Sequence, residues 1–354
     1  MFDKPPCSAY IFFALFLHSS RLAGYPYQRG ICPDIQLTII RIMKAEILGF
    51  GRPPQDALMS LRSLVPETAM TAELLGTERN SHAVQISKDG LLLTTGYSVL
   101  EASQVLLTNR RGESSEAIVL AQDFDSGLAL LKPQTAIGLH YLETASIRSL
   151  NEGDELQILA CDEKNAIPVE LCTIDEYSGR WEYLLEQALY TVPLYERWSG
   201  AALLNSDNKL CGIGSLALGI RNREGHFEPG NMFVPVDLVM PHIEHLLRHG
   251  KKPGALRPWL GTLIEESNGE IQVVGIYHGA PAALAGVRPG DIINRVNGEK
   301  VSSVAGFLKT VWKQGKAGSE VTITLATGKD ARDVVIVSTD RNSFFAQHAA
   351  GTLN

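Results

Sequence analysis

Short apolar or alternating runs dominate the chain from about residue 81 to residue 131. They cover residues 83–86, 91–94, 104–107, 117–120 and 128–131, and turn residues separate them. This spacing is typical of an antiparallel sandwich or barrel. Asp89-Gly90 lies between the first two runs and predicts a type I′ hairpin turn, because this pair tolerates positive φ angles. The pattern therefore predicts a unit that is mostly β.

A second strand-rich block runs from residue 155 to residue 236 and closes with a helical pattern at residues 238–247. Lys251-Lys252-Pro253-Gly254 then indicates a linker, because Pro and Gly stop a helix. A third unit follows, with strands at 272–276, 321–325 and 334–337, an Asn297-Gly298 turn and an amphipathic helix at about 302–314.

These boundaries predict five segments. They are a leader or poorly defined segment at 1–70, a β unit at 71–250, a linker at 251–256, a C-terminal unit at 257–341 and a frayed tail at 342–354. Because the leader lacks the barrel pattern, we expect a chain that begins near Met70 to fold.

The composition excludes some classes of function. The 354 residues carry a formal net charge of −7 and no Lys/Arg block, so binding to nucleic acid is not expected. The five cysteines are odd in number and show no CxxC spacing, which favours buried thiols over a zinc site or a disulfide framework. Without a ligand cluster or phosphate loop, we predict no metal and no organic cofactor.

The N-terminus allows two interpretations. The apolar run at residues 9–17 follows Lys4 and is similar to the hydrophobic part of a secretory signal. It is shorter than the roughly 20 residues that a membrane-spanning helix needs. If this run is a secretory signal, the protein is expected in the periplasm or cell envelope. It is expected to associate with a membrane only if the run is an anchor. Alternatively, translation begins at Met43 and the protein is cytoplasmic.

The third unit resembles a bacterial PDZ domain. The resemblance rests on Pro258-Trp259-Leu260-Gly261, Gly279-Ala280-Pro281-Ala282, Pro289-Gly290-Asp291-Ile292-Ile293 and Val296-Asn297-Gly298, in this order. It implies that Leu260, Gly261 and Thr262 form a loop whose N–H groups bind a peptide's terminal carboxylate. Thr262, Leu263 and Ile264 would then pair with the peptide backbone. The expected partners are the C-termini of proteins or peptides.

The helix of this unit would form the opposite wall of the groove. Val304, Phe307, Leu308 and Val311 fall at i, i+3, i+4 and i+7 and therefore share one face. The plainer interpretation is that these side chains are core, and it applies most to Leu308 and Val311. Trp259 is equally well explained as a packing residue.

The preceding β unit resembles the HtrA family of trypsin-like serine proteases. The motifs are residues 88–95, 123–132, 198–203 and 231–236, followed by the junction at 257–261. The resemblance implies two antiparallel, six-stranded β-barrels followed by one PDZ domain, and a trimer, as is common in the family.

Aligned through these motifs, Ser199 keeps the position of the nucleophile. Tyr97 stands at the histidine position and Gly127 at the aspartate position, and Arg197 replaces a glycine of the oxyanion turn. A serine nucleophile needs an imidazole to take its proton and a carboxylate to orient that imidazole. A phenol with a pKa near 10 is not a useful base at pH 7.

Two other groups lie near enough in the sequence motifs to replace the missing base or carboxylate. His82 lies on a strand expected to run behind the nucleophile, although an exposed or packed histidine is the plainer interpretation. Asp123 and Asp125 flank the empty carboxylate position, but a shift of one residue along a strand reverses the side chain. The five histidines at 140, 226, 242, 245 and 249 have no reason to face the site.

The sequence therefore predicts a pseudoprotease that binds polypeptides through its PDZ domain and regulates or assembles with related proteases. The alternative is an active serine endopeptidase of protein quality control that uses Ser199 with a non-standard base. In a third interpretation, the barrels serve only as a scaffold for the PDZ domain.

Overall fold

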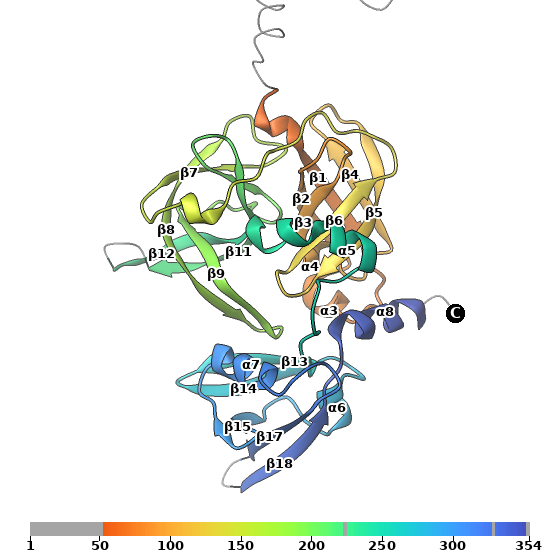
Figure 1. Ribbon diagram of the computed structural model, residues 1–354, viewed down its shortest axis with the longest axis vertical. Helices are drawn as coiled ribbons and strands as arrows, with labels where there is room; N and C mark the ends of the chain where they lie inside the picture. The colour runs from red at the N-terminus through yellow and green to blue at the C-terminus, as the bar shows by residue number, and fades with distance from the viewer. Residues whose placement is uncertain (1–51, 222–224, 328–329, 352–354) are drawn as a thin grey trace, which may run out of the picture. The chain divides into compact units, whose positions relative to one another are not determined.

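The computed structural model describes residues 52–221, 225–327 and 330–351 (Figure 1). The apolar run at 9–17, Cys7, Cys32 and Met43 lie outside the described residues.

The first part of the described chain is a closed barrel with the strand order β1-β2-β3-β6-β5-β4. All of its strand pairs are antiparallel. Its interior is apolar and includes Leu61, Leu92, Leu107 and Leu131, each at most 1% exposed. The strands are β1 (Leu58–Leu64), β2 (Glu78–Gln85), β3 (Leu92–Thr95), β4 (Gln104–Asn109), β5 (Ser114–Asp123) and β6 (Leu128–Pro133).

Strand β1 corrects the boundary expected at residue 70. It lies within the predicted leader, yet it pairs with both β2 and β4 and so closes the barrel. Met59, Leu61 and Ser63 are buried, whereas Arg62 and Leu64 are exposed. The alternation is present but weak as a signal, because a serine faces inward and a leucine faces outward. A chain that begins at Met70 would lack this strand.

The second barrel has the order β10-β11-β12-β9-β8-β7. Its core includes Ile158, Leu189, Leu203 and Phe233, none of which is exposed. The strands are β7 (Glu155–Leu159), β8 (Ile167–Gly179), β9 (Tyr183–Val192), β10 (Ala202–Leu204), β11 (Leu210–Arg221) and β12 (Phe227–Pro235). The pattern expected at 238–247 is split into η3 (Val236–Leu238), η4 (Met240–His242) and α5 (Ile243–His249).

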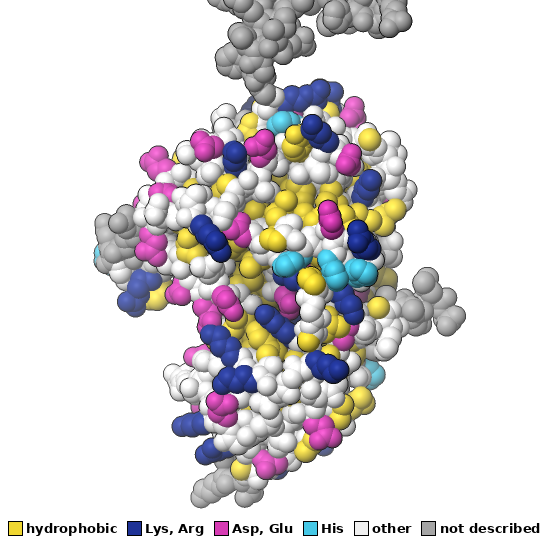
Figure 2. Space-filling model, viewed as in Figure 1, with side chains coloured by type: hydrophobic (Ala, Val, Ile, Leu, Met, Phe, Trp, Pro, Cys, Tyr) yellow, Lys and Arg dark blue, Asp and Glu magenta, His cyan; other side chains and the backbone are white. Residues whose placement is uncertain are grey.

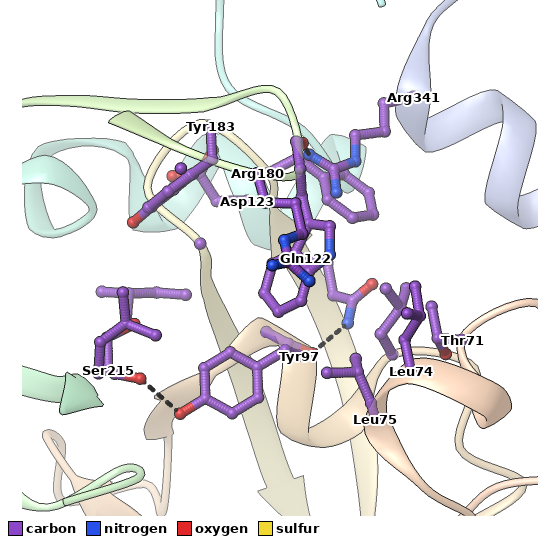
Figure 3. Close-up of a pocket in the computed structure, with 18 of the residues that line it drawn as sticks. Thr71, Leu74, Leu75, Tyr97, Gln122, Asp123, Arg180, Tyr183, Ser215 and Arg341 are labelled. Atoms are coloured by element: carbon purple, nitrogen blue, oxygen red, sulfur yellow. Dashed lines mark hydrogen bonds between the residues drawn. The ribbon is translucent and has the colours of Figure 1, made fainter. Parts of the chain in front are cut away.

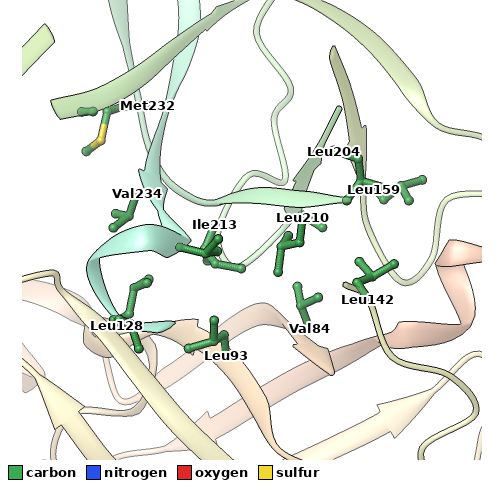
Figure 4. Close-up of a cluster of buried hydrophobic side chains, with 14 of the residues drawn as sticks. Val84, Leu93, Leu128, Leu142, Leu159, Leu204, Leu210, Ile213, Met232 and Val234 are labelled. Carbon is green, nitrogen blue, oxygen red and sulfur yellow. The ribbon is translucent and has the colours of Figure 1, made fainter. Parts of the chain in front are cut away.

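The two barrels pack on each other through a shared apolar cluster (Figure 4). Val84, Leu93 and Leu128 come from the first barrel, and Ile213 and Val234 come from the second. Each of these five side chains is at most 1% exposed. Burial of these apolar side chains stabilises the positions of β3 and β11, and both strands contribute residues to the site described below.

The C-terminal unit is a sheet of order β13-β14-β15-β17-β18, with β16 paired to β15. Its apolar core is buried beneath α7 and includes Phe307, Leu308, Val321 and Ile323, each 0% exposed. The elements are β13 (Thr262–Ser267), β14 (Glu270–Ile276), α6 (Pro281–Leu284), β15 (Ile292–Val296), β16 (Glu299–Lys300), α7 (Val304–Trp312), β17 (Glu320–Thr327) and β18 (Asp330–Val337). The predicted mostly β architecture, two barrels and a third sheet with a helix, is confirmed.

Two predicted turns have different outcomes. Asn297 and Gly298 have φ angles of 48° and 80° and join β15 to β16, as the type I′ signature requires. At Asp89-Gly90, only Gly90 has a positive φ, 80°. The hairpin forms there, but the type I′ prediction is wrong.

The expectation of a frayed tail is also wrong between residues 341 and 351. This segment forms α8 (Arg341–Gly351), and Phe344 and Phe345 are 6% and 5% exposed. Their rings lie 4.8 and 5.9 Å from the ring of Trp259. Packing of these two phenylalanines against Trp259 therefore holds α8 in place. Its position at the end of the sequence gave no sign of this contact.

Acidic and basic side chains are interspersed on the face shown in Figure 2, and histidines gather over α5. Among the described cysteines, Cys161 and Cys211 are buried free thiols, and Cys172 is also buried. In the described ranges, no helix is long and apolar enough to cross a membrane. The same residues contain no group of three or more His, Cys, Asp and Glu side chains suited to a metal ion.

Candidate functional site

The turn that carries Ser199 comes directly before β10. The Ala201 N–H donates to the Trp198 carbonyl at 2.9 Å, and the His82 N–H donates to the Ser199 carbonyl at 2.9 Å. Gly200 has a φ of 72°, and a Cβ added there would lie 1.9 Å from the His82 carbonyl oxygen. Strand β2 thus runs directly behind the turn, and only glycine fits between them.

The Ser199 hydroxyl is surrounded by other hydroxyls. Its Oγ lies 2.9 Å from the Tyr97 hydroxyl, 3.3 Å from Ser98 Oγ and 3.5 Å from Thr95 Oγ1. Tyr97 and Ser98 belong to α4 (Gly96–Val99), which follows β3. Tyr97, which the sequence aligns with the histidine position, therefore lies beside Ser199, together with two further hydroxyls that the sequence analysis did not name.

Tyr97 is also bonded to the second barrel. Its hydroxyl lies 2.8 Å from the Ser215 carbonyl oxygen (Figure 3), which in addition accepts from the Trp198 indole N–H at 3.1 Å. Burial raises the pKa of Tyr97. At neutral pH the phenol keeps its proton, so it supplies a hydrogen bond and no basic group.

Gly127 lies in the turn between β5 and β6, and Tyr183 covers it. Its φ is 73°, and an added Cβ would lie 2.9 Å from the Tyr183 hydroxyl oxygen. That hydroxyl donates to the Ser126 carbonyl at 2.6 Å. The space beside Gly127 is therefore filled by a phenol from β9, which sequence reasoning did not anticipate.

Neighbouring carboxylates are paired with basic residues of the linker region. Asp123 lies 2.7 Å from Lys252 Nζ and accepts from the Ser126 N–H at 3.2 Å. Asp125 lies 3.6 Å from an Arg257 guanidinium nitrogen. Burial raises the pKa of Asp125, and Arg257 opposes this effect. Both carboxylates thus have structural partners away from the hydroxyl group of residue 199.

His82 approaches Ser199 through its backbone. The imidazole is 6% exposed, and its Nδ1 has no hydrogen-bond partner among the described residues. Burial is the main cause that lowers its pKa, and Asp162 opposes it. His82, Arg197, Trp198 and Ser199 line one cavity.

Arg197 lies on the surface next to the nucleophile turn. It forms ion pairs with Asp162 and Glu163, the latter at 3.0 Å. About half of its side chain is exposed, at 52%. Asp162 and Glu163 follow β7. Their ion pairs with Arg197 therefore hold its side chain toward that segment.

A cavity of about 290 Å³ lies beside Tyr97 and Gly127 (Figure 3). Aromatic and aliphatic side chains form much of its lining, including Leu75, Trp181 and Tyr183. Gln122 enters it and donates to the Gly96 carbonyl at 3.0 Å. The cavity is therefore mainly apolar, with a few fixed polar groups.

In the C-terminal unit, the loop before β13 presents two backbone donors to one carboxylate. The N–H groups of Leu260 and Thr262 donate to Glu182 at 3.0 and 2.6 Å. Gly261 between them has a φ of 82°, and an added Cβ would lie 2.2 Å from Ala280 Cβ. The two N–H groups of the loop therefore converge on one carboxylate, and glycine is required at its centre.

The predicted walls of the peptide groove are β13 and α7. Leu260, Ile264, Val304, Phe307, Leu308 and Val311 belong to one buried cluster, and each is at most 4% exposed. The structure thus favours the core interpretation for all four helix residues. Leu263 points elsewhere: it packs with Trp259, Tyr277 and the two phenylalanines of α8. The predicted role of Leu263, backbone pairing with a peptide, does not involve this side chain, because alternate residues of a strand face opposite sides.

Comparison with known proteins agrees with this architecture. The PDZ domain family matches residues 258–337. The serine endoprotease DegS of Haemophilus influenzae is 25% identical over 272 residues, which are 72% of this chain and 75% of that protein. The serine protease Do-like HtrA of Lactobacillus helveticus is 25% identical over 271 residues, which are 68% of this chain and 63% of that protein. Over more than two thirds of its length, the chain is similar to serine proteases of the HtrA type.

The chain spans three quarters of DegS but less than two thirds of the relatives from Lactobacillus helveticus and Pseudomonas fulva. A probable periplasmic DegP-like endoprotease of Pseudomonas fulva is 26% identical over 308 residues, 78% of this chain and 62% of that protein. A serine endoprotease structure from Yersinia pestis has a TM-score of 0.48 and 24% identity, and the match covers 81% of this chain and 94% of that one.

The HtrA homologue therefore brings Ser199, Tyr97 and the backbone of His82 together, whereas Gly127 faces Tyr183. Sequence reasoning missed Ser98, Thr95, Tyr183 and Glu182. Ser98 follows Tyr97 directly and could have been suspected as a hydrogen-bonding neighbour. Tyr183 and Glu182 come from a hairpin more than 50 residues away from their partners, and no local pattern points to them.

Proposed function

We propose that this HtrA homologue is a pseudoprotease, in which a protease-shaped double barrel that does not hydrolyse peptide bonds is joined to a PDZ domain that binds polypeptide C-termini. The observation that carries the proposal is the surroundings of Ser199 Oγ. Its hydrogen-bonding neighbours are the hydroxyls of Tyr97, Ser98 and Thr95. None of these groups accepts a proton at neutral pH.

The lack of a proton acceptor is the main chemical reason to expect no hydrolysis. Attack by a serine requires that a base remove the hydroxyl proton as the C–O bond forms. Tyr97 has a pKa raised by burial, so its phenolate is even rarer than in water. Loss of the base alone lowers kcat by about a million-fold in subtilisin, a different protein with the same chemistry.

Two further features support the proposal. Tyr183 fills the space beside Gly127, so no carboxylate orients a base there. Arg197 precedes the nucleophile turn and is tied to Asp162 and Glu163. A non-glycine side chain at this position is expected to alter the loop that would offer N–H groups to an oxyanion.

The test is incubation with an unstructured protein substrate, run beside a serine-directed fluorophosphonate probe. The matched control is Ser199→Ala, which removes only the hydroxyl. We expect the wild-type protein and the variant to show the same background cleavage and no labelling. Cleavage that Ser199→Ala abolishes, or stoichiometric labelling of Ser199, would overturn the proposal.

A second candidate function, an active serine endopeptidase, is favoured by one observation. The buried imidazole of His82 lines the same cavity as Ser199, and its Nδ1 is unpartnered within the described chain. Two of the relatives described above are also named as serine endoproteases, and the third is named as a serine protease. In that case, cleavage would be lost in both Ser199→Ala and His82→Gln and retained in Tyr97→Phe.

For the PDZ domain, we propose that the loop at residues 260–262 binds a free terminal carboxylate. Two converging N–H groups and glycine's positive φ support this assignment. Peptides with an apolar last residue should bind with a Kd of about 1 μM, near −8 kcal/mol. An amidated peptide should bind more weakly, because it lacks the anion. Equal affinity for the acid and the amide would exclude this mode.

We further propose a location in the periplasm or cell envelope, and assembly as a homo-oligomer or with related proteases. The name of the Pseudomonas fulva relative, a probable periplasmic endoprotease, supports the location. Fusion of a reporter that is active only after export would test the location, and light scattering would test for a trimer. A cytoplasmic reporter signal or a monomer at all concentrations would reject the respective statement.

A further inference from the structure

The turn between β8 and β9 lies in the peptide groove of the PDZ domain. Glu182, at this turn, is 6% exposed. One oxygen of its carboxylate accepts from the Leu260 N–H at 3.0 Å, and the other accepts from the Thr262 N–H at 2.6 Å and the Thr262 hydroxyl at 2.9 Å. These are the donors expected to hold the terminal carboxylate of a peptide.

The backbone of the same turn also pairs with the sheet edge. The Ile264 N–H on β13 donates to the Arg180 carbonyl at 3.0 Å. A peptide that adds a strand to a PDZ domain would use such N–H groups along β13. The hairpin therefore accepts a hydrogen bond from the Ile264 N–H on β13, in addition to those from the loop at residues 260–262.

An apolar side chain completes the set of contacts. Leu184, two residues after Glu182, is 5% exposed and belongs to the buried cluster that contains Leu260, Ile264, Phe307 and Leu308. A bound C-terminal peptide would place its last apolar side chain against residues of this kind. A carboxylate, a paired backbone and a buried apolar side chain are thus all supplied by the hairpin.

Ion pairs hold the hairpin against both walls of the groove. Arg180 pairs with Glu265 on β13, and Glu176 pairs with Lys309 on α7. All four side chains are at least partly exposed. Because such exposed pairs contribute little and are screened by salt, the buried carboxylate of Glu182 is the main polar contact.

The conformation of Glu182 is itself unusual. Its φ is 53°, in the left-handed region that few residues other than glycine adopt. Burial raises the pKa of its carboxyl, and the hydrogen bonds from Leu260 and Thr262, together with the nearby Arg341, oppose this effect. A strained backbone and a buried carboxylate persist only where the surroundings hold them.

Arg341 connects this arrangement to the C-terminal helix. Its guanidinium donates to the Trp181 carbonyl at 3.0 Å and lies over the rings of Phe124 and Trp259. Trp181 precedes Glu182, so α8 secures the same turn from its other side. The hairpin is thereby fixed by the loop, the groove walls and the first residue of α8.

We propose that the β8–β9 hairpin is an internal ligand of the PDZ groove, and that a peptide with a free C-terminus binds only when it displaces the Glu182 carboxylate. This inference rests on the proposed binding of C-termini by the loop at residues 260–262. It adds that the binding-competent groove is a minor state of the intact protein. The apparent affinity is then lowered by the fraction of molecules in which the hairpin has left.

The test uses the intact chain and a fluorescent peptide with a free C-terminal carboxylate and an apolar last residue. Glu182→Ala removes the competing carboxylate and should tighten binding at least tenfold. Glu182→Gln keeps the size of the side chain, removes its charge and should tighten binding by a smaller factor. The matched control is Glu186→Ala, an exposed carboxylate on β9, which should leave the affinity unchanged.

A second measurement is independent of peptide binding. Hydrogen exchange at the amides of Leu260 and Thr262 should be faster in Glu182→Ala than in the wild-type protein, whereas exchange in β17 should be unchanged if the variant folds. If Glu182→Ala does not fold, the same comparison is made with Glu182→Gln.

The outcomes separate the two proposals. Equal affinity in the wild-type protein, Glu182→Ala and Glu182→Gln would overturn the internal ligand and leave C-terminal binding intact. If no variant binds the peptide, C-terminal binding fails. The exchange rates then decide whether the hairpin occupies the groove: faster exchange supports it, and unchanged exchange overturns it.

Discussion

Glu182 and Tyr183 are neighbours in the sequence but reach two different sites. The Glu182 carboxylate accepts from the Thr262 N–H of the PDZ loop at 2.6 Å, and the Tyr183 hydroxyl donates to the Ser126 carbonyl beside Gly127 at 2.6 Å. Any movement that withdraws Glu182 from the PDZ loop must therefore act on the residue that covers Gly127. The hairpin thus connects the PDZ loop at residues 260–262 with the turn that carries Gly127.

Restoring the family's residues should not restore proteolysis. In the double variant Tyr97→His/Gly127→Asp, the new aspartate would have a φ near 73°, and its Cβ would lie 2.9 Å from the Tyr183 hydroxyl. We expect no cleavage of an unstructured substrate and a loss of about 1–3 kcal/mol of stability in urea unfolding. Substrate cleavage by this variant that Ser199→Ala abolishes would contradict the expectation.

The position of the first strand predicts where the chain can be shortened. A chain that begins at Arg52 keeps β1 and should unfold in one cooperative transition. A chain that begins at Met70 lacks β1, exposes the edges of β2 and β4 and loses the buried Leu58, Met59 and Leu61. It should aggregate or lose its near-UV circular dichroism. Equal melting curves for the two chains would show that β1 is dispensable.

Two glycines of the PDZ domain provide a matched pair. Gly261 and Gly269 have φ angles of 82° and 75°, but an added Cβ meets Ala280 at 2.2 Å only at Gly261 and meets nothing within 4 Å at Gly269. Gly269→Ala should cost about 1 kcal/mol, as expected for a left-handed residue. Gly261→Ala should cost more and should also abolish peptide binding. Similar losses in both variants would mean that the loop has room for a methyl group.

The carboxyl of Glu182 predicts a pH dependence of stability. Burial raises its pKa, against hydrogen bonds from Leu260 and Thr262 and the charge of Arg341. Between the unfolded value, about 4.3, and the raised pKa, the native state binds more protons than the unfolded state. This contribution to stability is present at low pH and is lost as the pH rises through the raised pKa.

The measurement compares the free energy of unfolding of the wild-type protein and of Glu182→Gln between pH 4 and pH 7.5. The wild-type protein should lose stability relative to the variant as the pH increases. Glu186→Gln, which changes an exposed carboxylate on β9, serves as a control, and its difference from the wild-type protein should stay nearly flat. If the wild-type protein instead became more stable relative to Glu182→Gln toward neutral pH, the predicted direction of the pH dependence would be wrong.

Most of the strands could be predicted from the sequence alone, because alternation and turn chemistry are local. The runs at 83–86, 91–94 and 128–131 became β2, β3 and β6, and Asn297-Gly298 became a turn with two positive φ angles. Ordered motifs also determined the double barrel with its PDZ domain. Strand β1 was missed because Ser63 faces inward and Leu64 outward, which weakens the expected pattern.

Tertiary structure alone decided what surrounds the vacant positions. The sequence placed Tyr97 and Gly127 by alignment, but only the packing of β9 against the β5–β6 turn shows that Tyr183 fills the space beside Gly127. Likewise, Glu182 and Thr262 are 80 residues apart and meet only because two separate units pack on one hairpin. Periodicity reports which face of an element is buried, and it carries no information about which distant side chain covers that face.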